Sequence, residues 1–147
     1  MKRDDRLIFL LGHARHRVYL RLDQALLERA GITTAQSGAL FYLKNNDGCL
    51  LSQMGQGLML DKSAITGLVD RLEKKAMIER RNDPTDRRAI RLHLTRSGRD
   101  AAAKALPVVK QLNRAIKEGF SPEEIEIFSR VLKTTIERFG GVTRGKS

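Results

Sequence analysis

Residues 78–94 interrupt the helical periodicity that runs through the rest of the 147-residue chain. Ile78 to Arg81 and Ile90 to Leu94 alternate apolar and polar side chains, which is typical of half-buried strands. The residues between them, 82–89, are rich in turn formers and contain two adjacent arginines. The pattern predicts one β-hairpin with a basic tip in a mainly α fold.

Helical signals precede this hairpin. Apolar residues from Leu7 to Leu26 recur in steps of three and four and are followed by Gly31, so they predict a long amphipathic helix that ends there. Thr33-Thr34-Ala35-Gln36 matches a capping box, while Ser52 and Asp61 are expected to cap the next two helices. The helices predicted before the hairpin are 6–30, 34 to about 45, 53–58, and 62 to about 76.

Two more helices are predicted after the hairpin. Thr95 can cap a helix from Arg96 to about Gly119, which Pro107 is expected to kink. Ser121-Pro122 then starts a helix that should end at Gly140-Gly141. The order is therefore a long helix, three shorter helices, a hairpin and two further helices.

The helix that begins at Lys62 is the candidate recognition helix, because a helix-turn-helix places its second helix in the major groove of DNA. Its expected inward stripe is Ile65, Val69, Leu72 and Ala76, with Leu68 beside it. Lys62 can donate to guanine acceptors, and Ser63 and Thr66 can adapt to several bases. Taken singly, each of the three is more simply a solvated helix residue. The DNA-reading interpretation is favoured because the cap, the stripe and the basic hairpin coincide.

The hairpin tip carries the sharper signal. Arg87 and Arg88 can reach the minor groove, whose negative potential attracts arginine. Asp83 and Asp86 would hold these arginines in a fixed direction through charge-assisted hydrogen bonds. Five arginines within residues 80–91 argue against an ordinary charged turn. The predicted DNA-binding residues are Ser52, Gln53, Lys62, Ser63, Thr66, Arg71, Arg80, Arg81, Asp86, Arg87, Arg88 and Arg91, with Arg80, Arg81 and Arg91 assigned to phosphates.

The charge of the chain agrees with a nucleic-acid partner. It has 28 Lys and Arg against 17 Asp and Glu, a formal net charge of +11. Such a charge favours binding to nucleic acid or to an anionic membrane surface over a basic surface that only contacts solvent. The apolar run Leu7 to Leu11 is too short to span a bilayer, and basic residues follow it. We therefore expect no membrane segment, no signal peptide and a cytoplasmic protein. Cys49 is the single cysteine, so it cannot form an intrachain disulfide or a cysteine metal cluster.

Three stretches carry a family resemblance: Ile65 to Glu73, Asp83 to Ala89, and Leu94-Thr95-Arg96-Ser97-Gly98. Together with Gly31 to Gln36, they resemble the MarR family, the multiple antibiotic resistance regulators. The resemblance covers roughly the whole chain in the order of its elements. It implies a winged helix-turn-helix at residues 31–95, flanked by helical dimerisation regions at 1–30 and 96–147.

The resemblance also implies how such a protein works. An obligate homodimer, joined by the first helix and the last two, would bind double-stranded DNA at a palindromic operator. It would commonly act as a repressor that a small aromatic or anionic ligand releases. By position, Arg88 would be the minor-groove arginine and Asp86 would orient it. The ligand would bind in a cleft between the dimer helices and the DNA-binding lobe, with His13, Arg17 and Tyr42 as candidates.

Two features depart from the family pattern. Ala76 lies near the end of the recognition helix, where the family usually has glycine, so this helix is expected to end less sharply. The first helix has no cysteine, which excludes the thiol position used by peroxide-sensing members. Cys49 lies after the second helix instead, and a redox role for it is left open.

Three other functions compete with DNA binding. An enzyme has no support, because no Ser-His-Asp arrangement, His-Glu-x-x-His motif or phosphate loop is present. His13 and His16 could bind a metal from one helix face, but Arg15 and Arg17 beside them repel a cation. We therefore interpret His13 and His16 as two partly exposed polar residues and expect no metal or cofactor. A protein-interaction module of the same fold would not need arginines at the wing tip.

Overall fold

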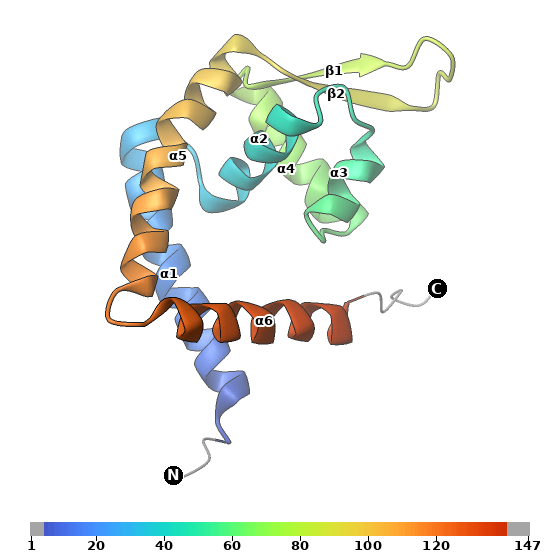
Figure 1. The fold of residues 1–147 in the computed structure, drawn as a ribbon. Helices are drawn as coiled ribbons and strands as arrows, with labels where there is room; N and C mark the ends of the chain where they lie inside the picture. Colours follow the sequence, from blue (N-terminus) through green and yellow to red (C-terminus); the bar gives the residue numbers. More distant parts are fainter. Residues whose placement is uncertain (1–4, 141–147) are drawn as a thin grey trace. The chain divides into compact units, whose positions relative to one another are not determined.

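The computed structural model describes residues 5–140, and its mainly helical fold with one small hairpin confirms the predicted fold class (Figure 1). The elements are α1 (Leu7–Ala30), α2 (Thr34–Asn45), α3 (Leu51–Gly57), α4 (Lys62–Lys74), β1 (Ile78–Asn82), β2 (Ile90–Leu94), α5 (Arg96–Lys117) and α6 (Pro122–Phe139). The chain divides into two compact units, 1–112 and 113–147.

Most helix starts follow the predicted capping residues. Thr33 Oγ1 accepts a hydrogen bond from Gln36 N at 3.2 Å, and Gln36 Oε1 accepts one from Thr33 N at 3.1 Å. Asp61 Oδ1 likewise accepts a hydrogen bond from Ala64 N at 2.8 Å at the start of α4. These bonds satisfy backbone N–H groups that have no partner within the first turn of a helix.

The start of α3 differs from the prediction, because Ser52 is not its cap. The helix begins at Leu51, and the side chain of Gln53 accepts a hydrogen bond from Leu50 N at 2.8 Å. The preceding segment is extended because it pairs with β2: Gly48 N donates to Leu92 O and Leu92 N donates to Cys49 O. This pairing, and not a polar cap, decides where the helix starts.

The core of the first unit lies between α2, α3, α4 and the hairpin, which pack against one another (Figure 1). Its largest fully buried side chains are Leu26, Ile32, Leu40, Leu43, Met54, Val69, Leu72, Ile78 and Leu92. Ile65, Val69 and Leu72 of the predicted inward stripe are buried, and so is Leu68. The hairpin pairs Ile78 with Leu94 and Asn82 with Ile90 in an antiparallel register. Helix α4 therefore rests on this core through its apolar side.

The end of α4 contradicts two expectations about Ala76. The helix stops at Lys74 and Ala76 is exposed, so Ala76 does not belong to the inward stripe. The turn is sharp: Ala76 N donates to Glu73 O at 2.9 Å and Met77 N donates to Leu72 O at 3.0 Å. This is a Schellman motif, in which the residue after the cap adopts a left-handed conformation. Ala76 does so with φ 57°, a conformation that usually calls for glycine.

We expect the substitution Ala76→Gly to stabilise the protein by about 0.5–1 kcal/mol. A left-handed conformation costs an L-residue about 1–2 kcal/mol, which exceeds the larger entropy that glycine loses on folding. Urea denaturation at a fixed protein concentration measures the difference. Ala103→Gly at an exposed position inside α5 is the control and should destabilise by about 1 kcal/mol. A destabilised Ala76→Gly variant would contradict the strain argument.

Helix α5 continues through Pro107, so the proline does not end it. Its first part, to Leu112, belongs to the first unit, where Ala101, Ala102, Ala105 and Val108 are buried. The helix ends at Lys117, two residues before the predicted end. Gly119, in the second unit, then adopts a positive φ of 87° in the turn before α6.

Helix α6, in the second unit, begins as predicted. Ser121 Oγ accepts a hydrogen bond from Glu124 N, the Glu124 side chain accepts one from Ser121 N, and Pro122 is the first helical residue. No residue of α6 is buried. Its exposed large apolar side chains are Ile127, Phe128, Val131, Ile136 and Phe139. The predicted end at Gly140-Gly141 lies partly outside the described residues.

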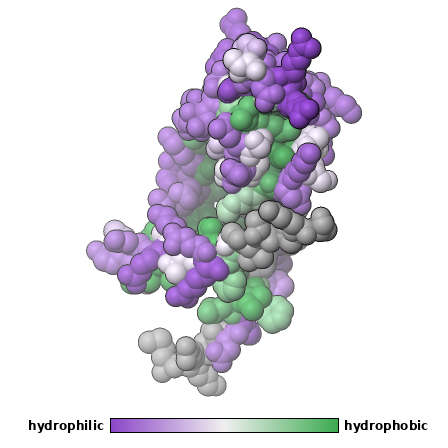
Figure 2. Space-filling model, turned by 90° about the vertical axis from the view of Figure 1, so that its right-hand side faces the viewer, coloured by the Kyte–Doolittle hydropathy of each residue, from purple (hydrophilic) through white to green (hydrophobic). Residues whose placement is uncertain are grey.

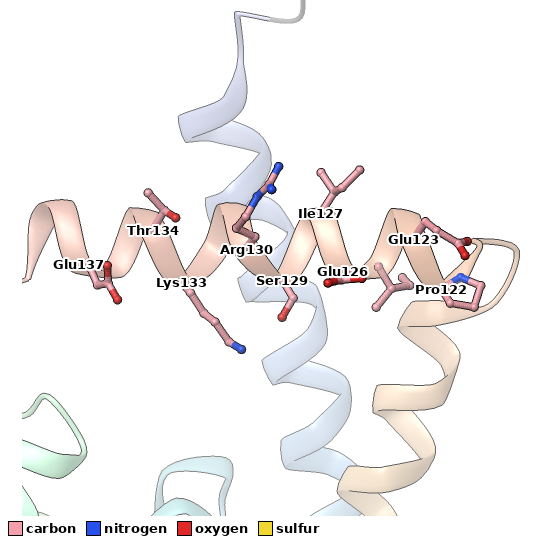
Figure 3. A pocket seen from close by; sticks show the side chains of 10 residues that line it. Pro122, Glu123, Glu126, Ile127, Ser129, Arg130, Lys133, Thr134 and Glu137 are labelled. Carbon is pink, nitrogen blue, oxygen red and sulfur yellow. The ribbon is translucent and has the colours of Figure 1, made fainter.

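One surface hollow of about 850 Å³ lies along α6 (Figure 3). All ten side chains that line it come from this one helix, among them Ile127, Arg130 and Glu137. The hollow is therefore an open helix face and not an enclosed ligand cavity.

The first turns of α1 expose apolar side chains in every direction. Leu7, Ile8, Phe9, Leu10 and Leu11 are all exposed, with Ile8 at 82%. Figure 2 shows this hydrophobic surface where α1 begins, near the bottom of the view, whereas hydrophilic side chains cover the hairpin tip at the top. None of the helices within residues 5–140 has the length and apolar composition needed to cross a membrane.

Candidate nucleic-acid interface

The amino end of α4 presents the side chains that the sequence predicted for base contacts. Lys62 and Ser63 are exposed and Thr66 is half-buried. Thr66 Oγ1 donates to Lys62 O at 2.7 Å, so its hydroxyl keeps only acceptor capacity for a further partner. One turn further along α4, Arg71 is exposed and its guanidinium lies beside Gly67. Lys62, Ser63 and Arg71 are thus at the surface of α4, and Thr66 borders its buried stripe.

The two residues of α3 predicted to bind DNA differ in whether their side chains already form a hydrogen bond. Ser52 and Gln53 are both exposed. However, Gln53 Oε1 already accepts a hydrogen bond from Leu50 N. A contact from Gln53 to DNA would have to use its amide NH₂ group or break this bond.

The tip of the hairpin is built around the buried carboxylate of Asp83. Thr85 N and Thr85 Oγ1 donate to its Oδ1 at 2.8 and 2.7 Å, and Arg91 Nε donates to its Oδ2 at 2.7 Å. The hydrogen bonds from Thr85, followed by that from Arg91, lower the pKa of Asp83 from 3.8 to about 2. Because the pKa is lowered on folding, the ionised carboxylate stabilises the turn above pH 3.8, and this stabilisation is lost as the pH falls through about 2. The turn therefore keeps its geometry at any physiological pH.

The second tip carboxylate, Asp86, acts on the backbone. Its Oδ1 accepts a hydrogen bond from Arg88 N at 2.9 Å, which is the geometry of an Asx turn. Arg87 and Arg88 are exposed, and neither guanidinium forms a hydrogen bond or ion pair with the residues that the structure describes. The expected direct contact between the aspartates and these guanidinium groups is thus replaced by a fixed backbone turn. It leaves two arginine side chains available for an external anion.

Two other arginines predicted as phosphate contacts have partners inside the protein. Arg91 donates to Asp83 and, through a guanidinium N–H, to Gly48 O at 2.8 Å. Arg80 forms ion pairs with Asp70 and Glu73 of α4. These contacts join the hairpin to the loop before α3 and to α4. A phosphate role for Arg80 or Arg91 stays a prediction.

Arg81 is the third arginine assigned to phosphates, and it remains at the surface. It pairs with Glu79 on the same strand at 3.2 Å, and both side chains are more than half exposed. The hydrogen bond between them raises the pKa of Arg81 and lowers that of Glu79. An exposed pair of this kind is weak, so Arg81 can exchange its partner for a phosphate at little cost.

The Leu-Thr-x-x-Gly motif has a structural function that sequence analysis did not identify. Thr95 Oγ1 accepts from Gly98 N as the predicted cap of α5, and it also donates to Ala76 O at 2.6 Å. Thr95 N donates to Met77 O at 3.1 Å. A Cβ atom placed on Gly98 would lie 2.1 Å from Met77 O. Thr95 and Gly98 therefore join the start of α5 to the turn after α4.

The predicted ligand residues lie on different elements. His13 and Arg17 are exposed on α1, as is His16. Tyr42, on α2, donates its hydroxyl to Gln53 O at 3.3 Å, and its ring lies against Gly57. Their joint use as a ligand site stays a prediction. Within residues 5–140, no three metal-ligating side chains come together, so His13 and His16 have no third partner.

Cys49 is a buried residue of the hydrophobic core. Burial is the main cause that raises the pKa of its thiol above the ordinary 9.0. The reactive thiolate is therefore disfavoured and shielded from solvent. These observations do not support a redox role for Cys49.

Comparison with known proteins agrees with this geometry. The sequence model of the MarR family matches residues 30–89. Over 107 residues, the chain is 31% identical to the uncharacterised HTH-type transcriptional regulator YsmB of Bacillus subtilis, covering 73% of each protein.

Solved structures extend the similarity to the whole fold. A probable transcriptional regulator from Pseudomonas aeruginosa superimposes with a TM-score of 0.83 at 29% identity, over 90% of this chain and 98% of that one. The S. aureus MepR–DNA complex gives a TM-score of 0.83 at 25% identity, over 88% of this chain and 96% of that one. With its capped recognition helix and arginine-tipped wing, the chain belongs to the MarR family of DNA-binding transcriptional regulators.

Proposed function

We propose that this protein is a repressor that binds an inverted-repeat DNA site as a homodimer, with α4 in the major groove and the wing in the minor groove. The observation that carries the proposal is the wing tip. Arg87 and Arg88 project from a turn that Asp83 and Asp86 brace, and they have no partner among the described residues. Such preorganised arginines suit the narrow, negative minor groove. The similarity to MepR, which was solved on DNA, supports the same mode of binding here.

Base recognition is assigned to Lys62, Ser63 and Thr66. They lie in the first turns of α4, where recognition helices meet base edges, and Lys62 and Ser63 are exposed while Thr66 is half-buried. Phosphate contacts are assigned to Arg81 and to the exposed residues of α3 and α4, Ser52 and Arg71. In this division, α4 supplies sequence preference and the arginines supply affinity and register.

Dimerisation is assigned to residues 1–30 and 96–147, and DNA reading to residues 31–95. The first turns of α1 are apolar on every side, as expected of a helix enclosed by protein. Helix α6 has no buried residue although Phe128, Val131 and Ile136 are apolar. A second copy of the chain is the occupant that a two-fold DNA site requires. Exposed apolar surface on both flanking regions supports such an interface.

Release from DNA is assigned to a small aromatic or anionic ligand. Arg17 offers a cation, and His13 and Tyr42 offer rings for stacking and hydrogen bonding. A ligand that prefers one spacing of the two recognition helices would shift the dimer toward or away from the DNA-binding form.

The test is selection of bound sequences from a random duplex pool at two salt concentrations, with sedimentation analysis of the free protein. We expect a dimer, an inverted repeat with half-sites about one helical turn apart, and an affinity that falls steeply with salt. Recovery of no motif, with only salt-sensitive background binding, would overturn the proposal. The basic surface would then be non-specific.

A further inference from the structure

The carboxyl ends of α1 and α4 and the amino end of α2 meet at one side chain. Lys75 Nζ donates to Gly31 O at 2.7 Å and to Gln36 Oε1 at 3.0 Å. Gly31 is the residue that ends α1, and Gln36 lies in the first turn of α2. Lys75 is itself the residue that ends α4. One ammonium group therefore joins three helices of the first unit.

Both acceptors of Lys75 are held in place independently. Gly31 O is one of the carbonyls at the end of a helix, where the helix dipole concentrates negative charge and favours a cation. Gln36 is 4% exposed, and its Oε1 also accepts the capping hydrogen bond from Thr33 N. A lysine bound to two fixed acceptors has a defined position, whereas a free surface lysine has many.

A second polar contact joins α1 to the DNA-reading module. Asp23 Oδ1 accepts a hydrogen bond from Thr34 N at 2.7 Å, at the first residue of α2. Asp23 thus connects α1 to α2, and Lys75 connects the end of α1 to the end of α4. Because α2 packs against α4, two such contacts at different points resist rotation of the α2–α4 pair about α1, which one contact alone would permit.

Lys75 is far from the proposed base contacts. Thirteen residues separate it from Lys62, which corresponds to roughly 20 Å along a helix. Its ammonium is directed at backbone and amide oxygens of the protein. A small rotation at this end of α4 would move the other end, where the base-reading side chains lie, by a larger distance.

We infer that Lys75 is a positioning residue that fixes the direction of the recognition helix relative to α1. The inference rests on the proposed function, in which α1 belongs to the dimerisation region. In such a dimer, the angle between α1 and α4 sets the distance between the two recognition helices. Lys75 would therefore determine which half-site spacing the protein accepts.

The test compares Lys75→Met with Lys74→Met, a neighbour that is exposed and forms no side-chain hydrogen bond or ion pair with residues 5–140. Both variants lose one positive charge. Binding is measured on the selected operator and on duplexes whose half-sites are one or two base pairs closer or farther apart. Lys75→Met is expected to bind the selected spacing about five- to tenfold more weakly and to lose most of its preference for it. Lys74→Met should keep the wild-type preference.

Two further measurements separate positioning from other roles. The salt dependence of binding should be unchanged in Lys75→Met, since only removal of a lysine that contacts phosphate would lower the slope by about one. Lys75→Arg, which can donate to the same two oxygens, should recover most of the spacing preference.

A sharp preference retained by Lys75→Met, an equal loss at every spacing, or a lower salt slope would each overturn the inference. Absence of any spacing preference in the wild-type protein would instead overturn the proposed inverted-repeat function, and the inference with it.

Discussion

Replacing Arg88 by alanine is expected to weaken operator binding about tenfold or more while leaving the dimer intact. Arg88 is exposed at the wing tip, and Asp86 fixes its backbone through the hydrogen bond to Arg88 N. The turn is thus formed before DNA arrives, so little conformational entropy is lost when the guanidinium enters the minor groove. A well-placed arginine contact contributes about 1–3 kcal/mol to binding, which corresponds to the expected loss.

Fluorescence anisotropy with the selected operator at several salt concentrations measures this effect. The slope of affinity against salt should fall by about one, because one cation no longer displaces a counterion. Lys44→Ala on α2 removes one positive charge from an exposed side chain that belongs neither to the proposed DNA contacts nor to the dimerisation regions, and it should change affinity little. Sedimentation must show a dimer for both variants. An Arg88→Ala protein with full affinity would contradict the assignment of the wing to the minor groove.

Replacing Gly98 by alanine is expected to destabilise the protein by about 3 kcal/mol, with a fall in Tm of roughly 10 °C. The added Cβ would lie 2.1 Å from Met77 O and 2.7 Å from a methyl carbon of Leu94. The carbonyl belongs to the backbone, so a simple side-chain rotation cannot relieve the contact. Relief requires the start of α5 to move away from Met77, which would break the hydrogen bonds that Thr95 makes to Ala76 and Met77.

The same substitution at Gly67 provides the matched control. A Cβ at Gly67 would have its nearest contact at 3.5 Å, with the flexible guanidinium of Arg71. Gly67 lies inside α4, where alanine is favoured over glycine by about 1 kcal/mol. Gly67→Ala should therefore raise stability while Gly98→Ala lowers it, both measured by thermal and urea denaturation at one protein concentration. A Gly98→Ala variant as stable as the wild type would show that the close approach of α5 to Met77 is not required.

Much of the fold was predictable because its signals are local. The caps at Thr33, Asp61 and Ser121 bond to residues three positions away, so a short stretch of sequence contains both partners. The alternation in residues 78–94 likewise follows from the two-residue repeat of a strand. The predicted cap at Ser52 was wrong, because the start of α3 depends on the pairing of residues 48 and 49 with β2, which lies far away in the sequence.

The candidate site was predictable only in part. Arg87 and Arg88 were recognisable because a turn rich in Pro and Asp forces adjacent side chains to the surface. The partners of Arg80 and Arg91 could not be predicted. Whether an arginine faces solvent or a neighbouring carboxylate depends on the packing of other elements. Ala76 was misjudged for a related reason. The Schellman turn after α4 is stabilised by Thr95, which lies nineteen residues further along the chain.

The elements, their order and the arginine-rich tip follow from the amino-acid sequence, since they depend on periodicity and on hydrogen bonds between near neighbours. The tertiary structure alone decided how those elements are joined. Arg91 reaches Gly48, Lys75 reaches Gly31, and Asp47 accepts a hydrogen bond from Leu94 N, across separations of 43, 44 and 47 residues. No local pattern marks such pairs, because each side chain could be satisfied by water until packing of the core brings its partner within reach.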